Sequence, residues 1–425
     1  MIAAPWVWNL LAGPSGRPQQ YYTGRHRHKR EGHTNMVRAL VCTLMLVGPL
    51  LVAHAATYYV APDGSENGDG SEQHPWPTPQ YALSRVTGGN TIIVRPGTYR
   101  GGVQLRPEHT GTPEQPTVLK SEDKWKAVII GSETHCIWTE PGCEYTIIDG
   151  FQVFGARHDG VKLCGNNCTV RNCWAHNNVA MGLASHNTSG NTFDSNLVEY
   201  NGSHVQFHHG VYVGGSHHTI TRNIVRHNAG WGLHLYAEIR DSLIALNLVH
   251  GHRYRTGILV ACPEGGGGNR IIGNTVVDNA DALDVRRGRG EVIANNILCS
   301  RYDPIILRDP VGEITLGPNL CEPASANQGP EGITGDPKFI DTVRGVYWLR
   351  EDSPARGKGS AQYLLATDFW GRPPDATVPP ALGCFPYVEA LTKPQAREKW
   401  YWEWPYEFYH SQEMGVPDLW DVVEG

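Results

Sequence analysis

A repeated pattern of apolar and polar positions runs through most of the chain and is plainest between residues 192 and 236. Residues 192–215 read TFDSNLVEYNGSHVQFHHGVYVGG, and residues 216–236 read SHHTITRNIVRHNAGWGLHLY. In each copy a β-branched or apolar run leads to an Asn, a second Asn follows five positions later, and a Gly opens a new strand-like run. Only the first copy has an insertion, which carries His204, His208 and His209. Self-similarity at such a period predicts stacked structural units.

The same pattern recurs from residue 145 onward at intervals of 22 to 27 residues. Its first marker column is Gly150, Asn172, Asn196, Asn223, Asn247, Asn274, Asn296 and Asn319. Its second column is Asn177, Asn201, Asn228, His252 and Asn279, and its strand-opening column is Gly160, Gly182, Gly210, Gly232 and Gly257. Each repeat is too short for a helix pair and fits three short strands, which is one coil of a parallel β-helix. We interpret the Asn markers as residues that adopt the left-handed conformation at bends and stack into amide ladders.

The two ends of the predicted solenoid differ from its middle. TYYV at residues 57–60 predicts a strand, and PQYALSRV at residues 79–86 predicts a short capping helix, because a terminal coil must shield its core. Beyond Asp336 the repeat loosens, and DPKFID and VYWL predict last strands before a Pro-rich loop and a Trp- and Tyr-rich tail. We therefore divide the chain into an upstream extension (1–35), a signal peptide (36–55), a parallel β-helix (56–335) and a C-terminal cap or wrap (336–425).

Residues 37–56, VRALVCTLMLVGPLLVAHAA, have the features of a secretory signal. One Arg precedes an apolar run that Gly48-Pro49 interrupts, and the run ends in an Ala-x-Ala cleavage pattern. The run is too short for a membrane span. Because a signal should begin near its Met, Met36 is the expected start, and we interpret residues 1–35 as mis-assigned upstream translation or as a long extra leader. The sequence thus predicts a secreted or periplasmic protein with no membrane segment after cleavage.

Charge and cysteine content limit the partners and predict cross-links. Residues 56–425 hold 30 Lys or Arg and 41 Asp or Glu, a net charge of −11, which does not favour nucleic acid. Nine cysteines follow the signal, and in an exported protein some of them should form disulfides. Cys299 and Cys321 hold nearly the same phase in adjacent repeats, so we expect them to bridge neighbouring coils. We expect a monomer.

The chain resembles the right-handed parallel β-helix proteins of the pectin-lyase-like superfamily, in its secreted bacterial form. The resemblance rests on TYYVAPDGS, TIIVRPGTY and the N-x-[IV]-x-x-N repeats, and on GDPKFIDTVRGVYWLREDSPARGKGS with TDFWGRPP near the end. It covers about residues 56–388 and implies an all-β, right-handed parallel β-helix. It implies no single activity, because the superfamily includes polysaccharide lyases, uronate epimerases, glycoside hydrolases and non-catalytic proteins.

Stacking would turn one position of each Gly-apolar-x-apolar strand into an outward column. That column is Lys162, Ala184, Tyr212, His234, Leu259, Asp284 and Ile306, and the residues before or after it include His208, His209, Trp231, Tyr236 and Arg286. Such a line of polar and aromatic side chains predicts a groove for an anionic polysaccharide. The first hypothesis is β-elimination at a uronate, which needs a cation at the carboxylate, a base and an acid. We assign His209, His234, Tyr212 and Arg255 to catalysis, and Lys162, His208, Trp231, Tyr236 and Arg286 to substrate binding.

Other functions remain open on the sequence alone. Asp281, Asp284 and Asp303 predict a Ca²⁺ site, although they would equally pair with Arg286, Arg287 and Arg308. A glycoside hydrolase would need two carboxylates, such as Asp281 with Asp284, and no paired-Asp motif supports it. The Asp-Pro-His-Asp motif of alginate epimerases is absent, and so is a pectate-lyase signature. A uronate epimerase and a non-catalytic glycan-binding surface protein are the further alternatives.

Overall fold

The computed structural model describes residues 55–131, 133–262, 266–343, 345–375 and 377–385. The predicted upstream extension, nearly all of the signal peptide and the aromatic tail after residue 385 lie outside these residues. None of the described helices is both long enough and apolar enough to cross a bilayer.

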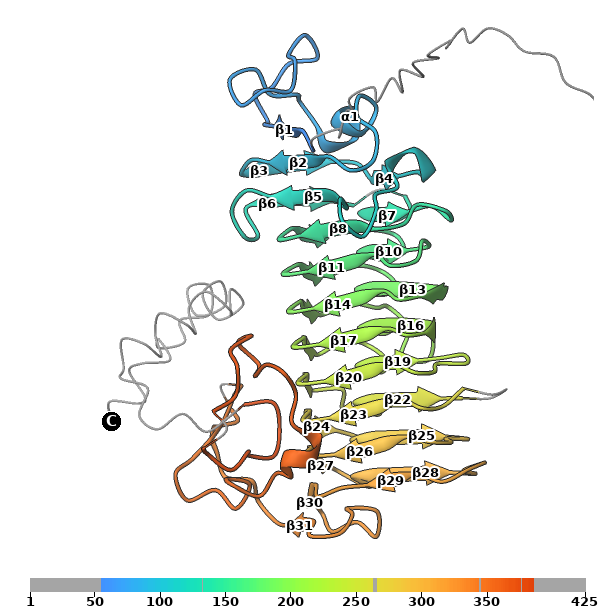
Figure 1. Ribbon diagram of the computed structural model, residues 1–425, viewed down its shortest axis with the longest axis vertical. Coiled ribbons are helices and arrows are strands. Elements are labelled where there is room, and N and C mark those ends of the chain that lie inside the picture. Colours follow the sequence, from blue (N-terminus) through green and yellow to red (C-terminus); the bar gives the residue numbers. More distant parts are fainter. Residues whose placement is uncertain (1–54, 132, 263–265, 344, 376, 386–425) are drawn as a thin grey trace, which may run out of the picture. The chain divides into compact units, whose positions relative to one another are not determined.

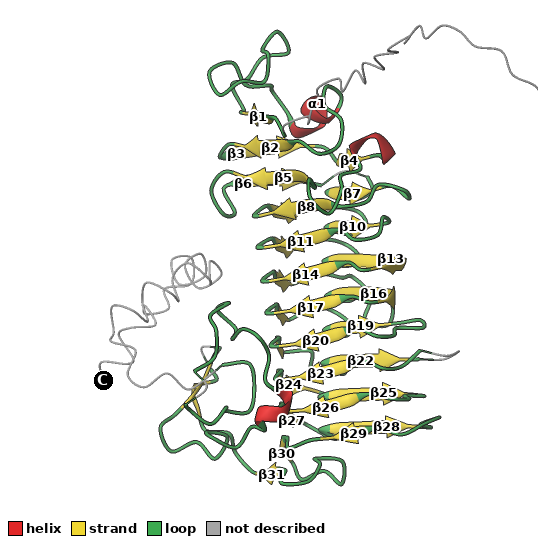
Figure 2. Cartoon of the chain, viewed as in Figure 1, coloured by secondary structure: helices red, strands yellow, loops and turns green. Residues whose placement is uncertain are grey.

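Three parallel sheets form the body of the protein, and each coil adds one strand to each sheet (Figures 1 and 2). The β1 sheet comprises β1 (Thr57–Val60), β2 (Thr91–Val94), β5 (Thr117–Ser121), β8 (Thr146–Asp149), β11 (Thr169–Arg171), β14 (Thr192–Asp194), β17 (Thr219–Thr221), β20 (Leu243–Ala245), β23 (Arg270–Ile272), β26 (Val292–Ala294) and β29 (Thr315–Leu316). The β3 sheet comprises β3 (Gly97–Arg100), β6 (Ala127–Ile130), β9 (Gln152–Phe154), β12 (Trp174–His176), β15 (Leu197–Glu199), β18 (Ile224–Arg226), β21 (Leu248–His250), β24 (Thr275–Asn279), β27 (Ile297–Ser300), β30 (Leu320–Glu322) and β31 (Ile333–Thr334). The β4 sheet comprises β4 (Val103–Leu105), β7 (Ile137–Thr139), β10 (Val161–Leu163), β13 (Leu183–Ser189), β16 (Val211–Ser216), β19 (Leu233–Leu235), β22 (Ile258–Ala261), β25 (Leu283–Arg286) and β28 (Ile305–Arg308). The predicted all-β, parallel β-helix fold is confirmed.

The core is a stack of apolar side chains that point inward from all three sheets. In the β1 sheet one column runs Val170, Phe193, Ile220, Ile244, Ile271 and Ile293, all fully buried. The Gly that opens strands β10, β13, β16, β19 and β22 of the β4 sheet is required by this packing. A Cβ atom at Gly210 would lie 2.6 Å from Cγ1 of Val225 and 2.8 Å from the carbonyl oxygen of Gly232. The recurring Gly therefore reflects close approach between two sheets.

The Asn columns form buried amide ladders, as predicted. In the earliest coil, however, each ladder position lies one residue after the Asn that the sequence pattern indicated. Each ladder Asn donates to the side-chain oxygen of the next, as Asn196 does to Asn223 at 2.9 Å and Asn223 to Asn247 at 3.0 Å. Cys173, not Asn172, precedes Asn196 in this column, since its backbone N–H donates to Asn196 Oδ1. The second ladder likewise begins at Asn178 rather than Asn177.

The left-handed bend lies one residue before each ladder residue. The two roles that we assigned to Asn, bend formation and amide stacking, therefore belong to different positions. Ser195, Arg222 and Leu246 precede ladder residues and have φ near +56°. Asn172, with φ of 54°, occupies this bend position itself. The ladder side chains are there for hydrogen bonding between coils and not for backbone freedom, and the interpretation of Asn196 and its successors as bend residues is wrong.

Asn247→Ala should lower the free energy of unfolding by about 1–3 kcal/mol. Asn247 is fully buried, donates to Ile220 and Asn274, and accepts from the backbone N–H of Asn223. The substitution leaves buried groups on both neighbouring coils without a partner. Urea unfolding followed by circular dichroism would measure the change. Asn67→Ala, in an exposed loop, is the matched control, and an equal shift in both variants would contradict the ladder's role.

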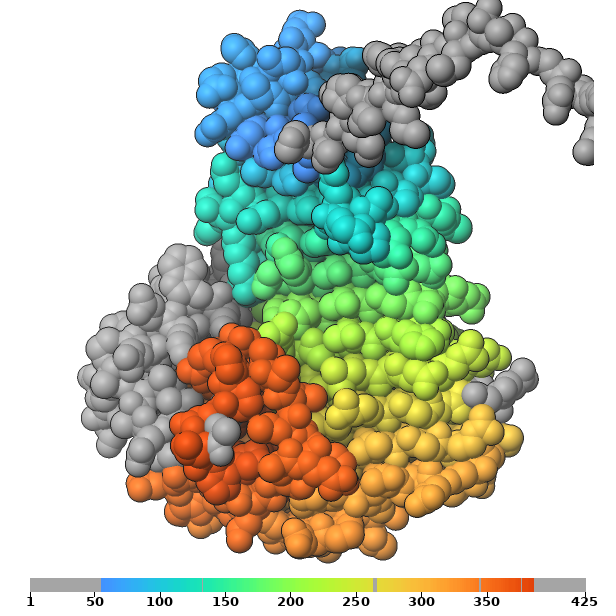
Figure 3. Space-filling model, viewed as in Figure 1, coloured from blue at the N-terminus to red at the C-terminus, as the bar shows by residue number. Residues whose placement is uncertain are grey.

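Both ends of the solenoid are covered. The predicted capping helix is α1 (Pro79–Leu83), whose N-terminus is capped by Thr78, and the short 3₁₀ turns η1 (Pro107–His109) and η2 (Ala361–Tyr363) lie in loops. The predicted last strands, β32 (Phe339–Asp341) and β33 (Val346–Leu349), form a separate antiparallel pair instead of a further coil. The segment after them returns along the solenoid (Figure 3), where Cys384 N–H donates to Thr275 and Ser360 N–H to Asn295.

The nine described cysteines are all free, so the predicted disulfides are not found. Cys321 lies opposite Leu298 in the β3 sheet, whereas Cys299 lies opposite Glu322. Adjacent residues of a strand point to opposite faces, so Cys321 enters the core and Cys299 faces outward. Burial raises the pKa of the Cys321 thiol to about 12, which keeps it protonated.

Candidate functional site

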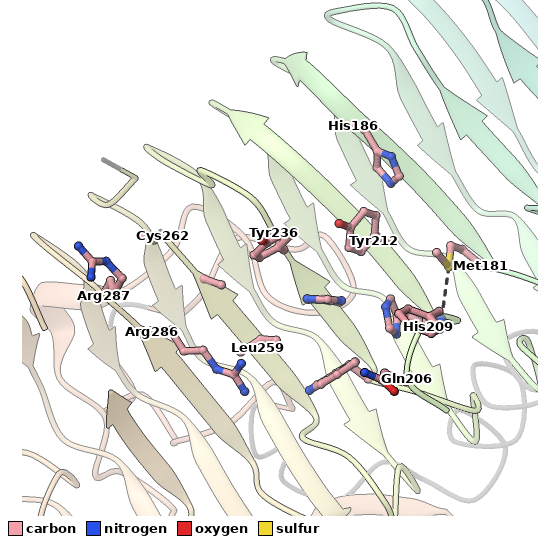
Figure 4. Close-up of a pocket in the computed structure, with 14 residues that line it drawn as sticks. Met181, His186, Gln206, His209, Tyr212, Tyr236, Leu259, Cys262, Arg286 and Arg287 are labelled. Carbon is pink, nitrogen blue, oxygen red and sulfur yellow. Dashed lines mark hydrogen bonds between the residues drawn. The ribbon is translucent and has the colours of Figure 1, made fainter. Parts of the chain in front are cut away.

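A groove with a volume of about 620 Å³ lies over the outer face of the β4 sheet (Figure 4). It crosses strands β13, β16, β19, β22 and β25, and the loop of residues 202–209 borders it. The lining residues are Met181, His186, Gln206, Phe207, His209, Tyr212, Trp231, His234, Tyr236, Leu259, Ala261, Cys262, Arg286 and Arg287. Most are aromatic, imidazole or guanidinium side chains, and no carboxylate is among these described residues.

Strand register brings the outward column together as the sequence predicted. Lys162 pairs with Ala184, Ala184 with Tyr212, and Tyr212 with His234 in successive coils. The column continues from His234 to Leu259, Asp284 and Ile306. The order of these residues along the groove is therefore fixed by hydrogen bonding of the backbone.

Four rings form a compact cluster on β16 and β19. The centroid of His234 lies 4.4 Å from that of His209, 4.9 Å from Tyr212 and 4.7 Å from Trp231. His186, one coil away, meets the edge of Tyr212 at 4.3 Å (Figure 4). Tyr212 thus stands between imidazoles on either side.

Burial keeps these imidazoles neutral. Desolvation, followed by neighbouring charges, lowers the pKa of His209 to about 2, of His234 to about 3 and of His186 to about 4. One ring nitrogen of each is buried without a hydrogen-bond partner, namely Nδ1 of His209 and His234 and Nε2 of His186. At neutral pH each ring can accept a proton. Burial also raises the pKa of Tyr212, with a smaller contribution from Tyr236, so its phenol stays protonated and can donate.

The two histidines assigned to catalysis differ in exposure. His209 is only 2% exposed, and its ring centroid lies 5.0 Å from that of Trp231. His234 is partly exposed in the groove. A group that must reach a sugar needs access, so His234 is the better placed of the two.

The inserted loop forms one wall of the groove. Phe207, 60% exposed, and Gln206 line it, and Arg255 holds the loop by donating from Nε to the carbonyl oxygen of Val205 at 3.1 Å. The guanidinium of Arg255 also lies over the Trp231 ring at 4.8 Å. Arg255 therefore contacts the wall rather than the floor of the groove.

Lys162 and His208, both assigned to substrate binding, lie outside the lining. The ammonium of Lys162 is 3.9 Å from the buried carboxylate of Asp159. Lys162 lies two strand spacings from Tyr212 in the outward column. His208 turns toward its own loop, where its Nδ1 accepts from the backbone N–H of Ser203 at 3.2 Å.

The three aspartates predicted to hold Ca²⁺ do not form a cation-binding group in the described residues. Asp284 is fully buried and paired with Arg286 and Arg308 at 2.8 and 3.0 Å. Asp281 accepts from the backbone N–H of Asp303 at 3.3 Å. As arranged, these residues do not fit a calcium ion, because the oxygens of Asp284 are already occupied by guanidinium groups. Binding of Ca²⁺ elsewhere stays an untested prediction.

Comparison with known proteins agrees with this architecture. Residues 58–207 match the family model described as Pel9A-like, right handed beta helix region. The solved structure of pectate lyase Pel9A superposes with a TM-score of 0.56 at 16% identity, over 78% of this chain and 96% of that chain. This chain is a right-handed parallel β-helix protein. A solved glycoside hydrolase also shares the fold, with a TM-score of 0.53 at 12% identity over 70% of this chain and 99% of that chain.

Two curated relatives match short segments of this β-helix protein. Pectate lyase PEL9 of Emericella nidulans is 35% identical over 79 residues, which is 19% of each chain. Uncharacterized protein YwoF of Bacillus subtilis is 30% identical over 73 residues, 17% of this chain and 15% of that protein. The matched segments thus span less than a fifth of either relative. The predicted resemblance to pectin-lyase-like β-helix proteins is confirmed.

The β-helix also brings residues to the groove that sequence reasoning did not select. His186 belongs to the column two residues beyond the outward one, and Met181 holds the same repeat position as His209 and Trp231, so the sequence pattern could have indicated both. Phe207 lies in the inserted loop, for which the repeat predicts no direction. Cys262 lies in the lining but is 1% exposed, and burial raises its thiol pKa to about 12, so it is no nucleophile.

Proposed function

We propose that this protein is a lyase that cleaves a uronate-containing polysaccharide by β-elimination in the β4-sheet groove. One observation carries the proposal. Imidazoles that burial keeps neutral surround a protonated phenol, and guanidinium groups line the same groove. Elimination needs just such a set, because a base removes the C5 proton, an acid protonates the leaving O4, and a cation neutralises the carboxylate.

His234 is the proposed base, because it lines the groove and is neutral at pH 7. Its low pKa makes it a weak base in the free protein, and a bound anionic sugar would stabilise the imidazolium that forms. His209 contacts it from beneath and is proposed as a positioning residue. Contact with His209 and Trp231 fixes the His234 ring from two sides.

Tyr212 is the proposed acid, with Tyr236 as the second candidate. Tyr212 contacts the rings of both His186 and His234, so the imidazole that accepts the C5 proton lies near the phenol that donates a proton to the leaving O4. Tyr236 is 43% exposed and 5.6 Å from His234, which suits it to contact sugar. Arg255, which lies over the Trp231 ring in the groove wall, is the proposed source of positive charge at the reacting unit.

The lining argues against a hydrolase. Glycoside hydrolysis commonly uses two carboxylates on either side of the scissile bond. The described lining residues include none, and the nearest candidate in the column, Asp284, is fully buried beneath two arginines.

Polygalacturonate is the first substrate to test, because the match to pectate lyase PEL9 and the Pel9A-like region both point to pectate. Export, predicted from residues 36–55, suits a polymeric substrate. We expect incubation of purified protein with polygalacturonate, alginate and glycosaminoglycans, each with and without Ca²⁺, to give unsaturated uronate ends that absorb in the ultraviolet. New reducing ends without that absorbance would instead identify a hydrolase. Altered uronate configuration without cleavage would identify an epimerase, and binding without products would leave a glycan-binding protein.

A further inference from the structure

Two arginines gather at one end of the groove, away from the ring cluster. Arg286 ends β25, Arg308 ends β28, and the two are paired in register on neighbouring strands. Arg287 follows Arg286 and also lines the groove, but its side chain points away from that of Arg286 (Figure 4). The side chains of Arg286 and Arg308 are 43% and 50% exposed, so each guanidinium keeps a face toward solvent.

A single buried carboxylate holds two of these guanidinium groups. Asp284 Oδ2 accepts from Nε and Nη2 of Arg286 at 3.0 and 2.8 Å. Both of its oxygens accept from Nε of Arg308, at 3.1 and 3.0 Å. Asp284 is fully buried, and a buried charge requires such partners. Two arginines and one aspartate leave a positive excess, so the carboxylate orients the cations without cancelling them.

The arginines are separated from the ring cluster by an apolar floor. His234 pairs with Leu259, and Leu259 with Asp284, so the arginine group lies two strand spacings from His234, with one coil between them. At a strand spacing of roughly 4.8 Å this is roughly 10 Å along the groove. Leu259 and Ala261, 2% and 4% exposed, form the surface between them. When one sugar unit of a polysaccharide contacts His234, a different unit of the same polysaccharide would therefore contact the arginine group.

We propose that Arg286 and Arg308 form a separate subsite for the carboxylate of a uronate unit distant from the reacting one, with Asp284 as its positioning residue. The inference rests on the proposed function for the identity of the ligand. A subsite at this place means that the substrate runs along the solenoid axis. Asp284 then orients the arginines and is not a metal ligand. Guanidinium groups in a fixed orientation suit carboxylate recognition, because the donors of each present a planar fork.

Binding of a defined oligogalacturonate, measured by calorimetry, tests the subsite. Arg308→Ala should raise Kd about tenfold, the loss of one charge-assisted contact. Asp284→Asn makes the groove more positive but should also raise Kd, because Arg286 and Arg308 lose the carboxylate that fixes their orientation. Arg270→Ala removes the same charge from an exposed position on β23 in the β1 sheet and should leave Kd unchanged. The methyl-esterified oligomer, which lacks carboxylates, should bind all four proteins alike.

The outcomes separate this inference from the proposed function. A wild-type protein that does not bind the oligomer, or Arg308→Ala with wild-type Kd, would overturn the subsite even if polygalacturonate is cleaved. Tighter binding by Asp284→Asn would show that only net charge matters and would overturn the positioning role. The expected pattern of Kd values without any unsaturated product would support the subsite and reject the lyase. Thermal unfolding of each variant shows whether it is folded, and Arg308→Lys, which keeps the charge but not the fork, should fall between wild type and Arg308→Ala.

Discussion

His234→Ala is expected to reduce turnover of a cleaved polyuronate by about 10²–10⁴-fold, the range for loss of a general acid or base. The imidazole stands in contact with Tyr212, His209 and Trp231 and lines the groove, whereas its backbone lies in β19 and is unaffected by the change. Initial rates from ultraviolet absorbance would measure the effect. His217→Ala, at a histidine whose side chain is 65% exposed outside the groove, should keep full activity. Equal rates for His234→Ala and wild type would refute its assignment as base.

The same residue predicts how activity depends on pH. With the pKa of His234 lowered to about 3, the free protein holds a neutral base throughout the mildly acidic range. We expect kcat/KM to stay level between roughly pH 7 and pH 5, and the acid limb of kcat to lie at higher pH, because bound anionic sugar raises the imidazole pKa. An acid limb in kcat/KM near the ordinary imidazole pKa of about 6.5 would contradict a buried, neutral His234.

His209→Ala should lower kcat as well, by acting on the orientation of His234. Because His209 is 2% exposed, the variant should change kcat far more than KM. His209→Gln or His209→Phe, which fill part of the same space, should recover activity in part. Full loss in all three variants would indicate that His209 itself transfers the proton.

Glu199→Ala is expected to lower the free energy of unfolding by about 3–5 kcal/mol, the largest stability effect that we predict for one side chain. Glu199 and Arg226 pair at 2.7 Å on neighbouring strands β15 and β18, with side chains 1% and 3% exposed. Glu199 also accepts from Trp174 Nε1 at 2.9 Å. The substitution removes the carboxylate that accepts from Arg226 at 2.7 Å on the buried outer face of the β3 sheet.

A double variant separates charge burial from packing in this pair. Glu199→Leu with Arg226→Met replaces both charges by apolar side chains and should restore much of the stability lost in Glu199→Ala. Arg171→Ala, at a pair whose arginine is 44% exposed, should cost at most about 1 kcal/mol and serves as the exposed control. Chemical unfolding of the three variants would measure these differences. A loss in Glu199→Ala no greater than that in Arg171→Ala would contradict the argument.

The fold was predictable because its sequence signals are local and repeated. Each coil repeats a Gly, an apolar pair and an Asn, so the register of Lys162, Ala184, Tyr212 and His234 could be derived by counting. The ladder was misplaced by one residue at Asn172 because Asn serves both at the left-handed bend and in the ladder. Those two positions are adjacent, and only hydrogen bonding distinguishes them.

The site was less predictable, because its chemistry depends on depth and on partners. Spacing placed His209 beside the strand but could not show that Trp231 covers it. Counting also put Asp284 in the outward column, where it resembled a metal ligand, although Arg286 and Arg308 enclose it. Cys299 and Cys321 were close in phase, yet one residue of offset sends them to opposite faces of the sheet.

The loop of residues 202–209 shows where this architecture accommodates new sequence. Strand β18 connects to β19 through residues 227–232, whereas β15 connects to β16 through residues 200–210, and both connections join strands in unchanged register. Evolution can therefore lengthen this corner without disturbing any coil. Side chains of the groove wall, such as Phe207, can therefore change while the scaffold stays constant, and under the proposed function transplanting residues 202–209 into a related solenoid would be expected to alter substrate preference.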